Sequence, residues 1–395
     1  MMRLHSAIMN LCSSAVLLLT VFNIEAASGS VLAGIAKDIQ EAEYVAIVKI
    51  FPPLDCEIAI KGCSKERVVL DAMQSQQGVS LVCLASQNGN RLPIRHRRLP
   101  TESAVQYVRE VCCCVARGGA VPVTFYLHHL SRTRDHFVLE DCIGSLQEVT
   151  LREIERYAPY CVSARDIESL LPSVQSSDDM RLLCVVMAVS CGDKRRTYAL
   201  LERLVTQDPI GAIAAGASDG IWGAMMLCDS EATWTDIVEE CKGDRFIARS
   251  PDGVFRAIEF GLKRKILVES RCVLLLEEIA SDPLLVPYII RVAERTRVSI
   301  KPSVVAQGVM SKAVERDRQL RSLVGVAVAD YVSSMSDEAW TEEFWRLVSV
   351  RPDAESDLKQ VIFRRTSSHH KPDVSNVEIH QSRFSACALR SEKLD

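Results

Sequence analysis

Two pairs of histidines are the first residues of this chain that could bind a metal ion or move a proton. His128 and His129 are adjacent, and so are His369 and His370 in a polar C-terminal segment. Adjacent side chains on a strand face opposite ways, so neither pair is expected to share a metal ion. The sequence also contains no His-Glu-x-x-His motif and no calcium-binding loop. We therefore expect structural or solvent-facing roles for these histidines, and we assign no metal and no cofactor.

His136 stands among three carboxylates, at Asp135, Glu140 and Asp141, and is the best place in the sequence to look for acid–base chemistry. A carboxylate beside an imidazole can orient it as a general base. The same residues also fit a solvated helix start, where carboxylates are stabilised by the helix dipole. A catalytic triad is assembled by the fold and need not show as a sequence motif, so we name no catalytic residue.

Cysteine is frequent, and 14 of the 15 cysteines follow the N-terminal leader. An even number in a chain expected to reach an oxidising compartment makes disulfides possible. Cys56 and Cys63 bracket a short loop and are the best disulfide candidates. Cys184, Cys228 and Cys272 lie in apolar helical stretches, where cysteine acts as a small buried hydrophobe. No Cys-x-x-Cys pair is present, which argues against zinc and thioredoxin-like sites.

Two further segments could bind a ligand. Residues 210–226 are rich in Ala and Gly, but no Gly-Lys-Ser or Gly-Lys-Thr follows, so small residues for close helix packing are expected rather than a phosphate loop. A basic run between residues 91 and 98 could bind an acidic partner, and a solvated loop would explain it as well. Its members are Arg91, Arg95, Arg97 and Arg98.

The composition of the 395-residue chain limits the function. A hydrophobic fraction of 48% fits a globular protein with a real core. A net charge of −4 gives no electrostatic footprint for nucleic acid or anionic lipid. Aromatic residues are only 6% of the chain, which disfavours stacking platforms for bases. We therefore expect no nucleic-acid partner.

Residues 1–27 have the order of a secretory signal peptide. Basic Arg3 is followed by an apolar stretch at 7–22 and by small residues at 26–30. The apolar stretch is short for a membrane span, which needs about 20 residues, although an uncleaved anchor is the alternative. No later segment is long and apolar enough to cross a bilayer. The sequence therefore predicts a secreted or periplasmic protein with no membrane span once the signal is removed.

Residues 28–122 are predicted to form a small β domain with one helix. Short β-branched runs bounded by Pro, Gly and Asn favour strands, and Asn-Gly favours a tight hairpin turn. Residues 121–130 fit either a strand or the first helix of the next domain. The expected elements are a helix in 31–42, strands at 44–51, 67–70 and 79–84, a turn at 87–90, a basic loop at 91–98 and a helix at 102–117.

Residues 123–365 are predicted to form an α-helical repeat domain. Helix-start signals recur about every twenty residues, as at Thr150 with Glu153, Ser177 and Ser336. Short amphipathic helices cannot bury their apolar faces alone, and stacking them in antiparallel pairs gives an α-solenoid of roughly forty residues per pair, in the range of HEAT-like repeats. Residues 366–395 are polar and predicted to form a loosely ordered tail.

Several segments carry a resemblance to a group of uncharacterised secreted bacterial proteins with a small β domain and helical repeats. Residues 41–49 resemble the first strand of a TIMP-like or netrin-like OB barrel, and residues 125–130, 135–141 and 182–193 look like that group's entry into its helical part. The resemblance implies an α+β multidomain fold and no established activity. TIMP-type inhibitors place a cysteine at the mature N-terminus, whereas Ser28-Gly29-Ser30 follows Ala27 here, so inhibition by that mechanism is not expected.

These observations favour a non-catalytic extracytoplasmic protein that binds another protein or acts as an envelope scaffold. Helical stacks offer long surfaces to a partner, and the sequence shows no reaction centre. A secreted hydrolase with a site at the junction of the two domains is the alternative. Tryptophan anchors many interfaces, although burial in the core is its commoner fate; the four tryptophans are Trp222, Trp234, Trp340 and Trp345.

Overall fold

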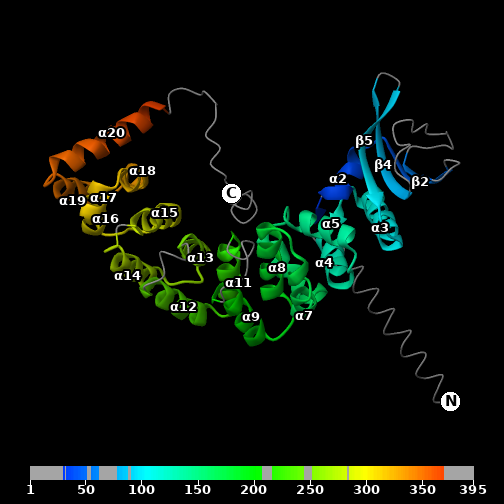
Figure 1. Cartoon of the computed structure of the whole chain (residues 1–395), viewed down its shortest axis with the longest axis horizontal. Helices are drawn as coiled ribbons and strands as arrows, with labels where there is room; N and C mark the ends of the chain where they lie inside the picture. The colour runs from blue at the N-terminus through cyan, green and yellow to red at the C-terminus, as the bar shows by residue number, and fades with distance from the viewer. Residues whose placement is uncertain are drawn as a thin grey trace, which may run out of the picture. The chain divides into compact units, whose positions relative to one another are not determined.

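The computed structural model of the chain is mostly helical, with a small antiparallel sheet near the N-terminus, as the sequence predicts (Figure 1). Two compact units are present, one built from the described residues up to Val174 with residues 189–192, the other from residues 175–188 and the described residues after Asp193. The predicted domain boundaries after residues 122 and 365 stay predictions. The structure describes residues 30–31, 33–50, 55–61, 78–87, 90–206, 216–243, 251–282 and 284–368.

Three predicted segments lie wholly or largely outside these residues. They are the signal peptide, the strand at 67–70 and the polar tail, of which only the first residues belong to the last helix. Within the described residues, no helix is both long enough and apolar enough to span a membrane.

The sheet of the first unit has four antiparallel strands in the order β3-β2-β4-β5. The register pairs Gln87 with Asn90, as the predicted turn requires, and residues 88 and 89 themselves lie outside the described residues. The strands at 44–51 and 79–84 are confirmed. The strands are β2 (Tyr44–Ile50), β3 (Asp55–Lys61), β4 (Gly78–Gln87) and β5 (Asn90–Leu99).

The sheet is open, so the closed OB- or TIMP-like barrel expected from the resemblance is wrong. Closure would require the edge strands β3 and β5 to pair with each other, and in the described strands they do not. Instead, helices α2 (Gly34–Glu41) and α3 (Glu102–Gly118) lie against one another, with β5 beside α3. Val45, Ile47 and Leu81 of this open sheet are buried.

The basic run at 91–98 lies in strand β5, which corrects the expectation of a loop there. A proline disrupts a strand only where its missing N–H would have to donate to a neighbouring strand. Strand β5 is an edge strand, so one of its sides has no neighbouring strand in the sheet. The register of the β4–β5 pair shifts between Cys83 and Leu84, opposite Pro93, which absorbs the irregularity. Arg97 is tied to α2, with its Nη2 2.9 Å from Asp38 Oδ2.

The helices of the first unit begin where the sequence predicts. Thr101 Oγ1 accepts from the Ala104 amide at the start of α3, and Gly119 ends that helix at φ 73°. Thr150 and Glu153 form the predicted capping box. Residues 121–130 resolve as a two-residue strand followed by a helix. The remaining elements are β1 (Ser30–Val31), β6 (Val121–Pro122), α4 (Val123–Arg132), α5 (His136–Leu146), α6 (Leu151–Cys161), α7 (Ala164–Glu168) and the 3-10 helix η2 (Leu171–Ser173).

The second unit is built of short helices, most of them 8 to 17 residues long. Their bounds are α8 (Ser177–Val189), α9 (Lys194–Thr206), α11 (Ser218–Cys228), α12 (Ser230–Lys242), α13 (Asp252–Lys263), α14 (Glu269–Ile279), α15 (Val286–Thr296), α16 (Pro302–Val309), α17 (Lys312–Arg316), α18 (Arg318–Ser334), α19 (Glu338–Val348) and α20 (Pro352–Ser368).

The helices of the second unit pack in two rows (Figure 1). In one row α9, α11, α13, α15, α18 and α20 each lie against the next, and in the other α12 lies against α14 and α16 against α19. Most of these contacts join helices that have one other helix between them in the chain. Each helix therefore buries its apolar face against neighbours close in sequence. The order of packing therefore follows the order of the chain.

Small residues permit close approach within the predicted Ala- and Gly-rich stretch. A Cβ at Gly216 would lie 2.3 Å from Ser177 Oγ, and a Cβ at Gly220 would lie 2.6 Å from Arg181 Cγ and 3.0 Å from Arg181 Cα. The backbone of α11 therefore touches α8 directly. The interpretation of these glycines as packing residues is confirmed at both positions.

We predict that Gly220→Ala lowers the free energy of unfolding by about 1–3 kcal/mol, because the new methyl group meets backbone that cannot move aside. Gly223 lies on the same helix, and a Cβ there would lie 3.8 Å from its nearest neighbour, Phe260 Cδ1. Gly223→Ala is therefore the matched control and should be neutral or stabilise by up to about 1 kcal/mol through helix propensity. Urea unfolding measures both, and equal effects would contradict the close contact between α8 and α11.

Candidate functional site

A buried carboxylate joins three helices of the first unit. Asp141, on α5, has a side chain that is 8% exposed. Its Oδ1 accepts from the Ile35 amide at 3.0 Å, and its Oδ2 accepts from the Tyr107 hydroxyl at 2.8 Å. Each oxygen is therefore satisfied by a different helix, α2 for one and α3 for the other. We call Asp141, Tyr107 and Cys142 the Asp141 cluster.

Asp141 supplies the cap that α2 lacks. The residue before α2 is Ala33, which has no side-chain acceptor for the first amides of the helix. A side chain from α5 takes that role, and it comes so close that a Cβ at Gly34 would lie 2.3 Å from Asp141 Oδ1. Gly34 also has φ +52°, so both its conformation and its contact favour glycine.

Burial controls the protonation of the cluster. Desolvation raises the pKa of Asp141, and the hydrogen bonds from Ile35 and Tyr107 oppose that rise in part. Burial also raises the pKa of Tyr107 and of Cys142, whose Sγ donates to the Tyr107 hydroxyl at 3.6 Å. The thiol is therefore held protonated and enclosed, which is the opposite of what a nucleophile needs. The Asp141 cluster is a structural joint of the first unit.

His128 and His129 lie on helix α4 rather than on a strand. His129 Nε2 is 3.0 Å from Glu110 Oε2, and its ring packs against Phe125 and Tyr107 with centroids 4.4 and 5.0 Å away. Burial lowers the pKa of both histidines. His129 is thus held by an aromatic cluster and one carboxylate, which is a packing role.

The acid–base group expected around His136 does not come together. Asp135 caps α5 by accepting from the Phe137 and Val138 amides. His136 and Glu140 are exposed neighbours on the helix surface, with Nδ1 and Oε2 3.8 Å apart. Asp141 faces the interior instead. These residues therefore have three separate roles: Asp135 caps α5, His136 and Glu140 form a surface pair, and Asp141 is buried.

The cysteines largely follow the predicted packing. Cys184 and Cys272 are fully buried, and burial raises the pKa of each to about 12, whereas Cys228 is half-buried. Cys56 lies in β3, its side chain is not described, and Cys63 lies outside the described residues, so their disulfide stays a prediction. Free thiols are present at Cys112, Cys113, Cys142, Cys161, Cys184, Cys191, Cys228, Cys241 and Cys272.

Three of the four tryptophans belong to the core: Trp222, Trp234 and Trp340 are 4 to 6% exposed. Trp340 also satisfies a loop, since its Nε1 donates to the Ile300 carbonyl at 2.7 Å. Trp345 is half-buried, and Lys359 Nζ lies 5.4 Å from its ring centre. Trp345 is therefore the tryptophan best placed to contact a partner.

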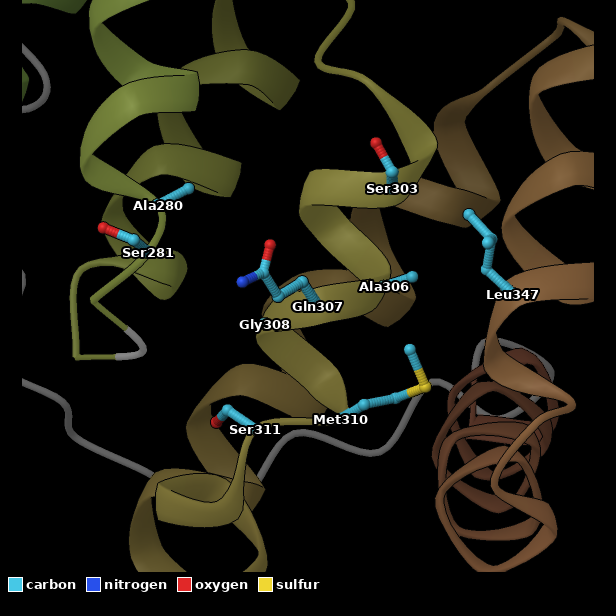
Figure 2. A pocket seen from close by; sticks show the side chains of 9 residues that line it. All are labelled: Ala280, Ser281, Ser303, Ala306, Gln307, Gly308, Met310, Ser311 and Leu347. Atoms are coloured by element: carbon cyan, nitrogen blue, oxygen red, sulfur yellow. The ribbon is translucent and has the colours of Figure 1, made fainter.

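A pocket of about 270 Å³ lies around α16 in the second unit (Figure 2). In the picture Gln307 points toward Ala280 and Ser281, while Met310 points toward Leu347. Ser281 Oγ donates to the Glu278 carbonyl, and Ser311 Oγ accepts from the Val314 amide. The nine lining residues are Ala280, Ser281, Ser303, Ala306, Gln307, Gly308, Met310, Ser311 and Leu347.

None of these nine residues is titratable, and two of the three serines are engaged with backbone groups. The pocket therefore offers apolar contact and neutral hydrogen bonding, with no base to activate a hydroxyl. Its lining therefore suits reception of an uncharged group.

A chain of ion pairs links α8, α11, α13 and α15, and the sequence reasoning missed it. Successive nitrogen–oxygen distances are 2.6, 2.7, 3.3, 2.7 and 3.7 Å. Arginine and aspartate recurring at intervals of nearly forty residues were the only signal of it. We call this set the Asp–Arg chain; its members in order of contact are Asp178, Arg181, Asp219, Arg256, Asp252 and Arg291.

Across the described residues, no group of three or more His, Cys, Asp or Glu side chains is arranged to hold a metal ion. No protein-family model, curated protein sequence or solved structure matches this chain.

Asp141 gives a test with a defined pH dependence. Asp141→Ala leaves the Ile35 amide and the Tyr107 hydroxyl buried without partners, and should cost about 2–4 kcal/mol of unfolding free energy. Asp141→Asn is the matched control, because its amide can accept from Ile35 and donate to the Tyr107 oxygen. It should cost less than the alanine variant at every pH.

The native protein should lose stability relative to Asp141→Asn as pH rises. The folded pKa of Asp141 lies above the ordinary value of 3.8, so the native state holds the proton more tightly than the unfolded chain. The stabilising contribution is complete below 3.8 and declines as pH rises through the raised folded pKa. Unfolding curves at a series of pH values measure this, and a pH-independent difference would contradict burial of an ionisable Asp141.

Proposed function

We propose that this chain is an exported, non-catalytic protein-binding or scaffold protein whose second unit is a HEAT-like α-solenoid. The observation that carries the proposal is a spacing that recurs among the side-chain contacts between helices. Ion pairs and hydrogen bonds join residues 36 to 40 positions apart through the whole unit. They include Arg181–Asp219, Tyr198–Asp236, Arg256–Asp219, Arg271–Glu231, Lys242–Glu278, Arg295–Glu259, Trp340–Ile300 and Arg321–Asp357.

This spacing equals one helix pair, so each pair contacts the pair before it and the pair after it. Such nearest-neighbour packing is the property that defines repeat proteins, in which stability accumulates along the chain. Repeat architectures expose extended surfaces and serve mostly in binding other proteins. The pocket around α16 supports binding over catalysis, since its lining residues provide no acid, base or activated nucleophile.

Export is part of the proposal and rests on the order of residues 1–30. The open sheet of the first unit and the absence of cysteine at residues 28–30 give no support to inhibition of metalloproteinases by a TIMP-like mechanism. The proposed activity is therefore recognition of a protein of the cell envelope or exterior.

A shortened chain tests the solenoid. We predict that a protein ending at Ser349, which lacks α20, keeps the remaining helices folded and unfolds cooperatively at a slightly lower temperature, because α20 contacts only α18 and α19 closely. A protein ending at Ser368 is the matched control and should match the full chain. Circular dichroism measures the loss, and collapse of helicity well beyond that of α20 would contradict a linear array.

Binding is tested with the purified protein that begins after Ala27. We expect a specific envelope protein to be retained by it, and the purified pair to bind saturably in isothermal titration calorimetry with micromolar or tighter affinity. A fluorophosphonate probe and a panel of ester and peptide substrates provide the opposing test. Covalent labelling of one serine together with turnover would show a hydrolase and contradict the proposal.

A further inference from the structure

Five exposed cations gather at the C-terminal ends of the neighbouring helices α13 and α15. Both helices lie in the same row and run the same way, since Asp252 and Glu259 of α13 contact Arg291 and Arg295 of α15 in order. Their C-terminal ends therefore lie at the same edge of the second unit. We call this surface the basic edge; its members are Lys263, Arg264, Lys265, Arg295 and Arg297.

The two helices end in the same backbone motif. Ile266 N donates to the Gly261 carbonyl at 2.8 Å, and Val298 N donates to the Ala293 carbonyl at 3.0 Å, which is the six-to-one bond of a Schellman end. The motif requires a left-handed residue, here Lys265 at φ 56° and Arg297 at φ 58°. Within the described part of the chain these are the two non-glycine residues with positive φ.

Glycine would occupy both positions without steric cost, whereas a residue with a Cβ is strained there. The attraction of a cation to a helix C-terminus offsets part of that strain and accounts for one cation at each end. That attraction does not account for the other three cations of the basic edge. A cation stands at each of the two left-handed positions, so the two helix ends together concentrate positive charge at this edge.

A buried carboxylate holds two of the cations in place. Glu259 is 4% exposed, and its oxygens lie 2.7 Å from Lys263 Nζ and 3.3 Å from Arg295 Nη1. The Arg264 guanidinium lies 5.9 Å from the Phe260 ring centre. Lys265 and Arg297 form no ion pair with any residue that the structure describes. The basic edge thus combines anchored cations with two that are open to a ligand.

The backbone that follows Arg297 is fixed as well. The Tyr331 hydroxyl accepts from the Ile300 amide and donates to the Val298 carbonyl, both at 3.0 Å. Val298 and Ile300 are buried. Because this loop is anchored to α18, the Arg297 side chain extends from a rigid base, and binding would cost little ordering of the backbone.

We propose that the basic edge binds an acidic segment, rich in Asp and Glu side chains, on the protein partner; this rests on the proposed function. Glu259 pairs with Lys263 and Arg295, whereas Lys265 and Arg297 pair with no carboxylate of the described residues, so the edge keeps unpaired positive charge on a chain whose net charge is −4. Guanidinium groups pair with carboxylates through two parallel hydrogen bonds, and the edge provides three arginines.

Protein is favoured over nucleic acid or membrane as the source of the negative charge. Nucleic-acid sites extend basic side chains along many phosphates, whereas this edge covers only two helix ends. A membrane surface attracts clusters of basic residues beside an exposed apolar face or lipid anchor. The size of the patch matches a short run of carboxylates.

The experiment uses the full exported chain and a fluorescein-labelled peptide of alternating Glu and Ser, with a Gln–Ser peptide as the uncharged probe. We expect fluorescence anisotropy to show saturable binding of the Glu peptide only. Lys265→Gly with Arg297→Gly should weaken that binding roughly tenfold or more. The same variant should keep or raise the melting temperature, because glycine relieves the strain at both helix ends.

Two matched variants separate position from overall charge. Lys265→Arg with Arg297→Lys keeps both charges and should retain binding. Arg195→Ala with Arg203→Ala removes two exposed cations from α9 and should leave binding unchanged. Undiminished binding by the glycine variant would overturn the proposal, and so would an equal loss in the α9 variant.

Tighter binding of single-stranded DNA or of phosphatidylserine vesicles, lost in the glycine variant, would assign the basic edge to a different class of ligand and overturn the proposal. The proposed function can fail separately, because the peptide assay requires no captured partner. A partner that binds the native chain and the glycine variant equally would leave the proposed function intact and refute the role of the basic edge.

Discussion

Each helix of this chain must bury an apolar face that it cannot cover alone, and the second unit meets that constraint with helices one pair away. Helices of about ten residues are only marginally stable by themselves, so their stability comes from packing. The contacts therefore recur at the length of a helix pair, whether they are ion pairs such as Arg181–Asp219 or buried hydrogen bonds such as Trp340–Ile300. Close approach at Gly220 follows from the same constraint.

Carboxylates act as the joints between these helices. Asp141 connects α2, α3 and α5 in the first unit, while Asp219 receives Arg181 and Arg256 in the second, and Glu259 receives Lys263 and Arg295. Each has two oxygens, so one side chain can satisfy donors from two elements at once. An unpaired buried carboxylate is costly, which makes these joints selective for the native arrangement.

The sequence predicted local structure well where one residue decides it. Thr101 and Thr150 set the starts of their helices, because caps depend on side chains a few positions apart, and the pairing of Gln87 with Asn90 is the register that the predicted turn requires. It also predicted that Cys184 and Cys272 are buried. The basic run was wrong as a loop because tolerance of Pro93 depends on which strand lies at the sheet edge, and that is a property of the assembled sheet.

The carboxylates that connect helices could not be predicted, because their partners lie far away in the sequence. Asp141 meets Ile35 from 106 positions away, and nothing near Asp141 in the sequence distinguishes it from Asp135, which caps its own helix. The predicted closed barrel was wrong because the strands found in a sequence do not show whether the two edge strands, here β3 and β5, pair with each other. The Asp–Arg chain was hidden since its members share a spacing and not a motif.

The cations of the basic edge lie at the surface, unlike the carboxylates that connect helices. Asp219 pairs with Arg181 and Arg256 from two other helices, and Glu259 pairs with Lys263 of its own helix and with Arg295 of α15. Lys265 and Arg297 follow the last residues of α13 and α15, and neither forms an ion pair with a described residue. Carboxylates pair with cations where these helices meet, whereas two cations of the basic edge, Lys265 and Arg297, are exposed and available to another molecule. The carboxylates that complete the pattern would therefore come from the partner.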